Sequence, residues 1–267
     1  MEYNRYNAVS AWELMDKAEP DVLVVGANTG KDCSYFIEFG AKSVTGLDVI
    51  EDIGKEYQHA KVRYVRESAE AMSFANESFD LVYCYATMEH VPDVASAFSE
   101  MARVVRKGGY IYSLAAPLWR SPLGHHMGEF EGSPWIHLVK SREEIIDYAI
   151  VHKLYPSDER ARHKVNYMLN PEYFNMRPSS DYTRACESLE GFRFIHNEIL
   201  MEDASMLSHP NGAAALKAGI PKEDLLGVTH RLIAQKRLRN DAITIIREKS
   251  SEWFAALRKK VRSFRSS

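Results

Sequence analysis

The sequence predicts an α/β protein built on a doubly wound parallel sheet with helices on both faces. Short apolar runs at residues 22–25 and 79–85 have the length and composition of buried parallel strands. Segments with helical periodicity separate these runs, so strand and helix alternate along the chain. A glycine-containing turn, Gly26 to Gly30, joins the first strand to the first helix. Together these observations favour one sheet over a helical bundle or a β-sandwich.

The first 116 residues supply five strands in order. A capping box, Ser10-Ala-Trp-Glu13, predicts a helix that ends near Pro20. Another helix is expected to start at Pro92 and Asp93 and to end at Lys107-Gly-Gly109. The remaining expected elements are strands at 22–25, 43–47, 61–66, 79–85 and 110–115, with a helix at 31–39.

The second half interrupts this alternation. Residues 117–189 contain no convincing strand, and a second capping box, Ser141-Arg-Glu-Glu144, predicts a helix through about Lys153. A further helix fits 157–169, a turn is expected at Pro210-Asn-Gly, and strands are expected at 192–201 and 228–235. We therefore expect a main domain at 1–116 and 190–240, a helical substrate-cap insertion at 117–189, and a basic amphipathic helix at 241–267.

Composition narrows the class of protein. The chain has 267 residues and a net charge of −3, so no overall basic field points to nucleic acid. Its three cysteines have no ligand-like spacing, which indicates reduced thiols and a cytoplasmic location. Neither a signal peptide nor an apolar run of about 20 residues is seen, so no transmembrane segment is expected.

The turn at Gly26–Gly30 and Asp48 predict a nucleoside-binding edge. Glycine lets a ligand approach bare backbone, and the helix that follows offers free N–H groups. Asp48 stands at the tip of the second strand, where a carboxylate can accept hydrogen bonds from a ribose diol. The dinucleotide fingerprint G-x-G-x-x-G is absent, because Asn28 and Asp32 stand beside the two glycines. This argues against NAD or FAD.

Several ordered motifs carry a family resemblance over about residues 20–116. They are Asp21-Val-Leu-Val-Val-Gly-Ala-Asn-Thr-Gly30, Glu70–Phe74, Ser78–Tyr83, Glu89-His-Val-Pro-Asp93 and Glu100–Gly109. The chain resembles the class I S-adenosylmethionine-dependent methyltransferases, in particular the methyltransferase type 11 group. It departs from the usual G-x-G-x-G turn at Asn28, a residue type that tolerates left-handed backbone angles. The resemblance implies a Rossmann-like sheet with an antiparallel last strand.

The resemblance also implies S-adenosyl-L-methionine as cofactor, with S-adenosyl-L-homocysteine as product, and a set of cofactor-binding positions. Ser68 stands where relatives usually carry an acid beside the adenine, and Glu67 or Glu70 can compensate. Tyr3 and Tyr6 can fold over the cofactor or be disordered. The implied cofactor-binding residues are Gly26, Ala27, Asn28, Gly30, Asp48, Val49, Ser68, Ala69, Tyr85, Ala86 and His90. For several of them a purely structural role stays open.

Residues 123–137 follow the fifth strand and are expected at the acceptor side. His125 or His126 is the candidate general base, because a neutral imidazole can take a proton from a hydroxyl near pH 7. Capping and solvation are the alternatives for these histidines. A metal held by His125, His126, Glu129 and His137 ranks lower because the spacing is not a known motif, and no metal is expected. Candidate acceptor-binding residues are Glu129, Trp135, His137, Tyr173, Arg177 and, with them, Phe174.

We therefore expect methyl transfer to a small-molecule or glycan acceptor, with oxygen favoured over nitrogen or carbon. The alternatives are an N- or C-methyltransferase, a nucleotide-dependent oxidoreductase, and a non-catalytic protein that binds the cofactor or a partner. Apolar residues of the tail, from Trp253 to Phe264, fall on one helical face among basic residues. Such a helix is expected to dock on its own domain or on a second subunit, and less so on a membrane surface.

Overall fold

The computed structural model describes residues 3–238 of the chain. The chain divides into two units, residues 1–236 and 237–267, and the first contains the whole sheet. The expected amphipathic helix at 241–267 lies outside the described residues. None of the helices between residues 3 and 238 combines the length and apolar character needed to span a bilayer.

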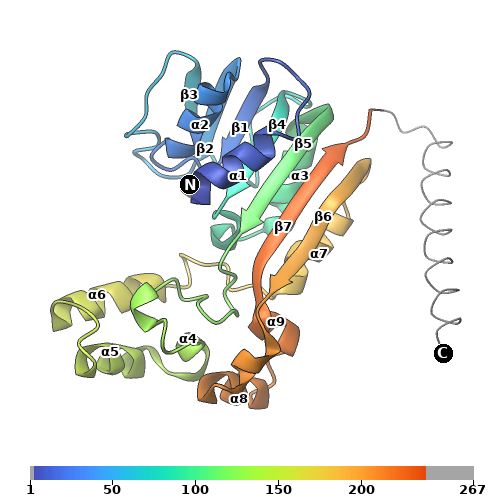
Figure 1. Ribbon diagram of the computed structural model, residues 1–267. Coiled ribbons are helices and arrows are strands. Elements are labelled where there is room, and N and C mark those ends of the chain that lie inside the picture. Colours follow the sequence, from blue (N-terminus) through green and yellow to red (C-terminus); the bar gives the residue numbers. More distant parts are fainter. Residues whose placement is uncertain (1–2, 239–267) are drawn as a thin grey trace, which may run out of the picture. The chain divides into compact units, whose positions relative to one another are not determined.

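One seven-stranded sheet forms the centre of the first unit (Figure 1). Its strand order is β3-β2-β1-β4-β5-β7-β6; the first five strands in sequence pair in parallel, and β7 pairs antiparallel with both β5 and β6. This confirms the Rossmann-like fold, including the antiparallel edge. The strands are β1 (Asp21–Val25), β2 (Ser43–Asp48), β3 (Val62–Arg66), β4 (Phe79–Tyr85), β5 (Val105–Ala115), β6 (Phe192–Met201) and β7 (Gly227–Lys236).

Helices cover both faces of the sheet. On one face, α1 (Tyr3–Trp12) and α2 (Lys31–Phe39) pack on a core that includes Phe36 and Tyr83. On the other face, α3 (Val94–Val104) and α7 (Ser179–Glu187) enclose Phe98, Tyr182 and Leu232. The strand order reverses between β1 and β4, so their carboxyl ends lie side by side at the switch point where ligands bind in such sheets.

A helical region lies between β5 and α7 in the sequence. Its elements are η2 (Gly128–Phe130), α4 (Ile136–Val139), α5 (Arg142–Val151) and α6 (Asp158–Met168), packed on a separate apolar cluster. The predicted capping box is present, since Ser141 and Glu144 exchange side-chain to backbone bonds. The β6–β7 connection adds η3 (Ala204–Ser208), α8 (Pro210–Lys217) and α9 (Lys222–Leu226), and α8 contacts α4 (Figure 1).

Three local predictions are wrong. The first helix spans Tyr3–Trp12 rather than starting at Ser10, whose hydroxyl donates to the Tyr6 carbonyl inside the helix instead of capping it. The glycines at 108 and 109 do not end a helix, because β5 begins at Val105 and runs through them. The sequence at Pro210 is no turn: proline takes the first position of α8, and the His209 side chain caps it.

Candidate functional site

The turn between β1 and α2 has three residues with left-handed backbone angles. Gly26, Asn28 and Gly30 have φ of 79°, 44° and 97°. The Leu47 carbonyl accepts from the N–H groups of Gly26 and Ala27, at 2.8 and 3.0 Å, which ties the turn to the tip of β2. Asn28 thus adopts the left-handed backbone angle of this turn, which asparagine tolerates better than most residues.

Asp48 is held rigidly at the end of β2. Its Oδ2 accepts from the Asn28 N–H at 2.9 Å, and its Oδ1 accepts from the N–H groups of Val49 and Ile50, at 2.7 and 3.3 Å. Both acceptor sites of Oδ1 are therefore in use, whereas Oδ2 keeps one site, and the Asn28 and Val49 side chains beside the carboxylate are exposed. This arrangement suits a ribose diol, one hydroxyl of which can donate to Oδ2.

The turn after β3 lies next to Asp48, because the Glu67 N–H donates to the Asp48 carbonyl at 3.0 Å. Ser68 donates its hydroxyl hydrogen to Glu70 at 2.9 Å, and Ala69 is buried. Glu67 accepts from the Ser73 N–H at 2.8 Å. The Glu67 carboxylate is thus engaged within the turn, while Glu70 also accepts from the Asp93 N–H at 2.7 Å and ties the turn to the loop before α3.

Tyr85 and Ala86 close the carboxyl end of β4. Tyr85 is half-buried, and burial raises the pKa of its phenol to about 12, which keeps it uncharged. Tyr3 from α1 lies over it, with the two ring centroids 6.0 Å apart. Ala86 is exposed with φ of 49°. Tyr3 and Tyr6 are both exposed, at 65% and 57%, and the folding of either over a cofactor stays a prediction.

His90 ends a short helix, η1 (Met88–His90), that follows β4. Its Nδ1 is 2.7 Å from the Tyr173 carbonyl, which can only accept, so Nδ1 carries the hydrogen and Nε2 keeps a lone pair. Burial lowers the pKa of the ring, which favours the neutral form. The His90 ring centroid lies 4.7 Å from those of both Tyr173 and Phe174.

The two predicted base candidates differ. His126 donates from Nε2 to the Pro117 carbonyl at 2.9 Å, which leaves the Nδ1 lone pair. Its ring centroid is 5.9 Å from that of His90, and burial lowers its pKa to about 4. His125 is fully buried, and its Nδ1 accepts from the Met127 N–H at 3.0 Å, so its remaining nitrogen has a hydrogen and no lone pair. His126 and His90 are brought together, and His125 is not in a position to take a proton.

Other predicted acceptor residues lie elsewhere. Trp135 is wrong as a pocket residue: it is fully buried among α8 and α9 residues and donates to the Leu225 carbonyl at 3.0 Å. Glu129 is exposed and accepts from Tyr155. His137 donates to the Trp119 carbonyl at 2.6 Å, and its ring centroid lies 5.0 Å from that of His125. Within residues 3–238 no three His, Cys, Asp or Glu side chains converge as a metal site would require.

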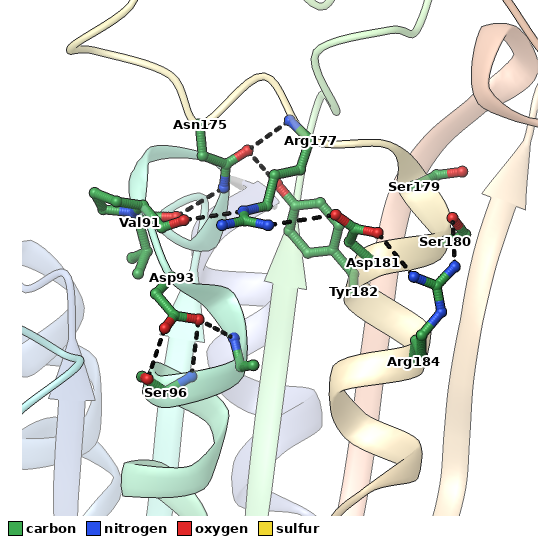
Figure 2. A network of polar contacts seen from close by, with 12 residues as sticks. Val91, Asp93, Ser96, Asn175, Arg177, Ser179, Ser180, Asp181, Tyr182 and Arg184 are labelled. Atoms are coloured by element: carbon green, nitrogen blue, oxygen red, sulfur yellow. Dashed lines mark hydrogen bonds and ion pairs between the residues drawn. The ribbon is translucent and has the colours of Figure 1, made fainter.

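Asn175 joins the acceptor-side segment to the His90 turn, and no sequence pattern indicated this role. Its Nδ2 donates to the carbonyls of Met88 and Val91, at 2.8 and 2.9 Å. Its Oδ1 accepts from the Tyr182 hydroxyl and from the Arg177 N–H, at 3.0 and 3.1 Å (Figure 2). The Asn175 N–H also donates to the Glu89 carbonyl at 3.0 Å. All polar atoms of this amide are therefore satisfied by the segments it connects.

Arg177 reinforces this connection. Its Nε donates to the Pro92 carbonyl at 2.9 Å, and its guanidinium lies 3.4 Å from Asp181, which also pairs with Arg184 (Figure 2). Asp93 in the same loop caps α3 by accepting from the N–H groups of Ala95 and Ser96. Arg177, which we expected to bind the acceptor, is thus committed to holding the loop between η1 and α3.

Glu89 is a second residue that sequence reasoning missed. It precedes His90 and is only 2% exposed, and neither carboxyl oxygen has a hydrogen bond of acceptable geometry within residues 3–238. Burial raises its pKa to about 8, and the amides of Glu89 and Ala116 oppose this only in part. The sequence around Glu89 does not show that this side chain is buried, so it could not indicate a role for the residue.

Comparisons with known proteins relate part of the chain to methyltransferases. Residues 23–113 match a methyltransferase domain family. A ubiquinone biosynthesis O-methyltransferase of Serratia proteamaculans is 36% identical over 98 residues, which is 34% of this chain and 40% of that protein. A sterol 24-C-methyltransferase of Gibberella zeae is 32% identical over 96 residues, 33% of this chain and 25% of that protein. The chain therefore spans less than half of these relatives.

Among solved structures, an S-adenosylmethionine-dependent methyltransferase from Mesorhizobium loti is similar, with a TM-score of 0.51 and 16% identity. The match covers 85% of this chain and 95% of that one. At this identity the similarity shows a shared fold, and it extends well beyond residues 23–113.

Proposed function

We propose that this chain, whose residues 23–113 form a class I methyltransferase domain, transfers the methyl group of S-adenosylmethionine to an oxygen of a small-molecule acceptor. The observation that supports the proposal is that a candidate nucleoside site and a candidate base lie at the same edge of the sheet. Asp48 and the Gly26–Gly30 turn offer a nucleoside site, and the His90 lone pair lies on the adjacent strand end.

The residues present fit the cofactor. Asp48 would accept the ribose hydroxyls, and the Gly26–Gly30 backbone would contact the methionine end. Ser68 and Ala69 would border the adenine, and Tyr3 with Tyr85 would cover the edge. When bound, S-adenosylmethionine supplies an electrophilic methyl group. The chain's own task is to align the acceptor and exclude water, an effect that can contribute up to about 10 kcal/mol.

His90 is the residue we assign as general base. The Tyr173 carbonyl orients its ring and sets its tautomer, in the way that a third group orients the base of other catalytic pairs. The neutral ring would accept the hydroxyl proton of the acceptor at Nε2 during methyl transfer. His126 stands beside it and is assigned a supporting role, as a second neutral imidazole that contacts the acceptor.

The surroundings of His90 support an uncharged acceptor. Tyr173, Phe174 and His126 line its ring, and burial keeps the two histidines neutral. Arg177, the cation of this region, is held by Pro92 and Asp181. Aromatic and neutral polar walls suit a phenolic ring or a sugar hydroxyl. The similarity to an O-methyltransferase supports oxygen, while a C-methyltransferase relative keeps carbon as the alternative.

We also propose that the helical region after β5 is the acceptor cap. It carries His126, and its α4 contacts α8 of the β6–β7 connection, so the cap would include residues 203–226 as well as the 117–189 segment. Tyr173 and Phe174 belong to the stretch that returns from α6 to α7.

The test compares His90→Gln with His126→Gln and His163→Gln, the last an exposed histidine on α6. Methyl transfer from labelled S-adenosylmethionine to an acceptor pool is measured beside calorimetric binding of S-adenosylhomocysteine. His90→Gln should lower turnover by about 100-fold or more with unchanged product affinity. Equal turnover in His90→Gln and His163→Gln would refute the base assignment. Binding without turnover in the unchanged protein would favour a non-catalytic cofactor-binding protein.

A further inference from the structure

Glu89 carries a buried carboxyl group that lacks a well-formed hydrogen bond within residues 3–238, although the amides of Glu89 and Ala116 lie close enough to lower its pKa. It is 2% exposed, and neither Oε1 nor Oε2 forms a hydrogen bond of acceptable geometry in the described part of the chain. A buried polar group without a hydrogen bond destabilises the folded state, so a group of this kind calls for an explanation. Its retention beside the assigned base suggests a role toward a ligand.

Glu89 directly precedes the assigned base His90 in η1, which follows the end of β4. A charge on its carboxyl would raise the pKa of Tyr85 at the end of β4 and that of Tyr173 beside His90. It also lies near Cys84 and Tyr182, and near the Ala116 amide that follows β5. The Glu89 carboxyl therefore borders the point where β4, β5 and the Tyr173 segment meet.

The turn that carries Glu89 is fixed. The Asn175 N–H donates to the Glu89 carbonyl, and the Asn175 side chain holds the carbonyls of Met88 and Val91. The backbone of η1, from which the Glu89 side chain extends, is therefore held in place directly before the assigned base His90.

The groups around Glu89 leave it uncharged at neutral pH. No cationic side chain contributes to its pKa, which burial raises to about 8. The titratable groups that face it are Cys84, Tyr85, Tyr173 and Tyr182, and the pKa of each is itself raised by burial, so all are neutral. An uncharged carboxylic acid has an O–H donor, whereas a carboxylate can only accept.

We propose that the Glu89 carboxylic acid donates a hydrogen bond to a second oxygen of the acceptor, so that the site selects uncharged acceptors with an oxygen beside the hydroxyl to be methylated. This inference rests on the proposed function and specifies its substrate class. The hydroxyl proton goes to His90, and Glu89 keeps its own proton throughout. An amine acceptor is a cation near neutral pH and would require an ionised Glu89 instead. Preferred binding of an amine would therefore contradict the proposal.

Two substitutions separate the alternatives. Glu89→Gln keeps an N–H donor of similar shape and cannot ionise, while Glu89→Leu is apolar and has no donor. The probes are catechol, phenol and benzylamine. Each is titrated into protein saturated with S-adenosylhomocysteine, and methyl transfer to each is measured over pH 6–9.

The unchanged protein should bind catechol about tenfold more tightly than phenol, the ratio expected for one hydrogen bond. Glu89→Gln should keep that ratio, and Glu89→Leu should reduce it to about one. The preference for catechol should decline above about pH 8 in the unchanged protein and not in Glu89→Gln. Infrared spectra should contain a protonated-carboxyl band at pH 7 that Glu89→Gln lacks.

Three results would overturn the inference: loss of the preference in Glu89→Gln as complete as in Glu89→Leu, no selection among the probes, or tighter binding of benzylamine than of catechol. The binding titrations do not depend on turnover. Selective catechol binding without methyl transfer would therefore support the role of Glu89 and count against the proposed reaction instead.

Discussion

Replacing Asn175 by alanine tests whether the acceptor-side segment positions His90. The substitution removes four side-chain hydrogen bonds: those to the carbonyls of Met88 and Val91, and those from Tyr182 and from the Arg177 N–H. A typical hydrogen bond contributes about 0.5–1.5 kcal/mol net, and the Tyr182 side chain, only 1% exposed, would be left with an unpaired hydroxyl. We expect the free energy of unfolding to fall by about 2–4 kcal/mol.

The substitution should also impair catalysis beyond its effect on stability. The Tyr173 carbonyl that orients His90 belongs to the same segment, two residues before Asn175. A loosened segment lets the imidazole rotate, so we expect kcat to fall by about 10–100-fold with little change in affinity for S-adenosylhomocysteine. Urea denaturation measures the first effect, and nitrogen–proton NMR of the His90 ring reports whether Nδ1 keeps its hydrogen.

Asn197→Ala is the matched control. Asn197 also holds a partly buried network, since it donates to the Thr183 carbonyl and contacts His230, and it belongs to β6 rather than to the site. It should lose stability and keep kcat at a temperature where it is folded. If Asn175→Ala loses under about 0.5 kcal/mol, or if its His90 tautomer and kcat match those of Asn197→Ala, the positioning argument is refuted.

Two further predictions follow from the described contacts. The folded protein should lose stability as the pH falls from about 6.5 toward 4. Burial lowers the pKa values of His126 and His137 to about 4 and of His125 and His230 to about 3, so in this pH range the unfolded chain binds more protons than the folded one. Urea midpoints that stay constant between pH 7 and 5 would contradict this. Gly26→Ala should lower the melting temperature, because a Cβ there would meet the Thr87 hydroxyl oxygen at 1.9 Å and Gly26 has φ of 79°. Thr87→Ala should restore part of the loss, since it removes that oxygen although the Cβ of residue 87 stays 2.7 Å away. An unchanged melting temperature in Gly26→Ala would contradict the steric argument.

The sequence predicted the parts of the fold that are governed by local pattern. The strand at 79–85 and the helix at 31–39 have the predicted bounds, because an apolar run and an amphipathic repeat each report directly on burial. Ser10 misled the prediction because its hydroxyl can bond either forward as a cap or back to the Tyr6 carbonyl. The choice depends on how α1 packs, which no local pattern contains.

The site was predictable only where its residues follow strand ends. Asp48 ends β2 and His90 lies in η1, the short helix that follows β4, so parallel topology places them at one edge. Asn175 and Glu89 are far apart in the sequence and are joined by a backbone hydrogen bond, which no residue spacing could predict. Trp135 shows the converse error, since an aromatic residue near polar ones looks like a binding residue until its burial is known.

The central claim is that the edge between β1 and β2 binds S-adenosylmethionine through Asp48, and calorimetry with S-adenosylhomocysteine tests it most directly. The unchanged protein should bind the compound, and Asp48→Ala should weaken binding by about 10–100-fold, as expected when hydrogen bonds to a charged group are lost. Absence of heat with the unchanged protein, or equal affinity in Asp48→Ala, would contradict the account.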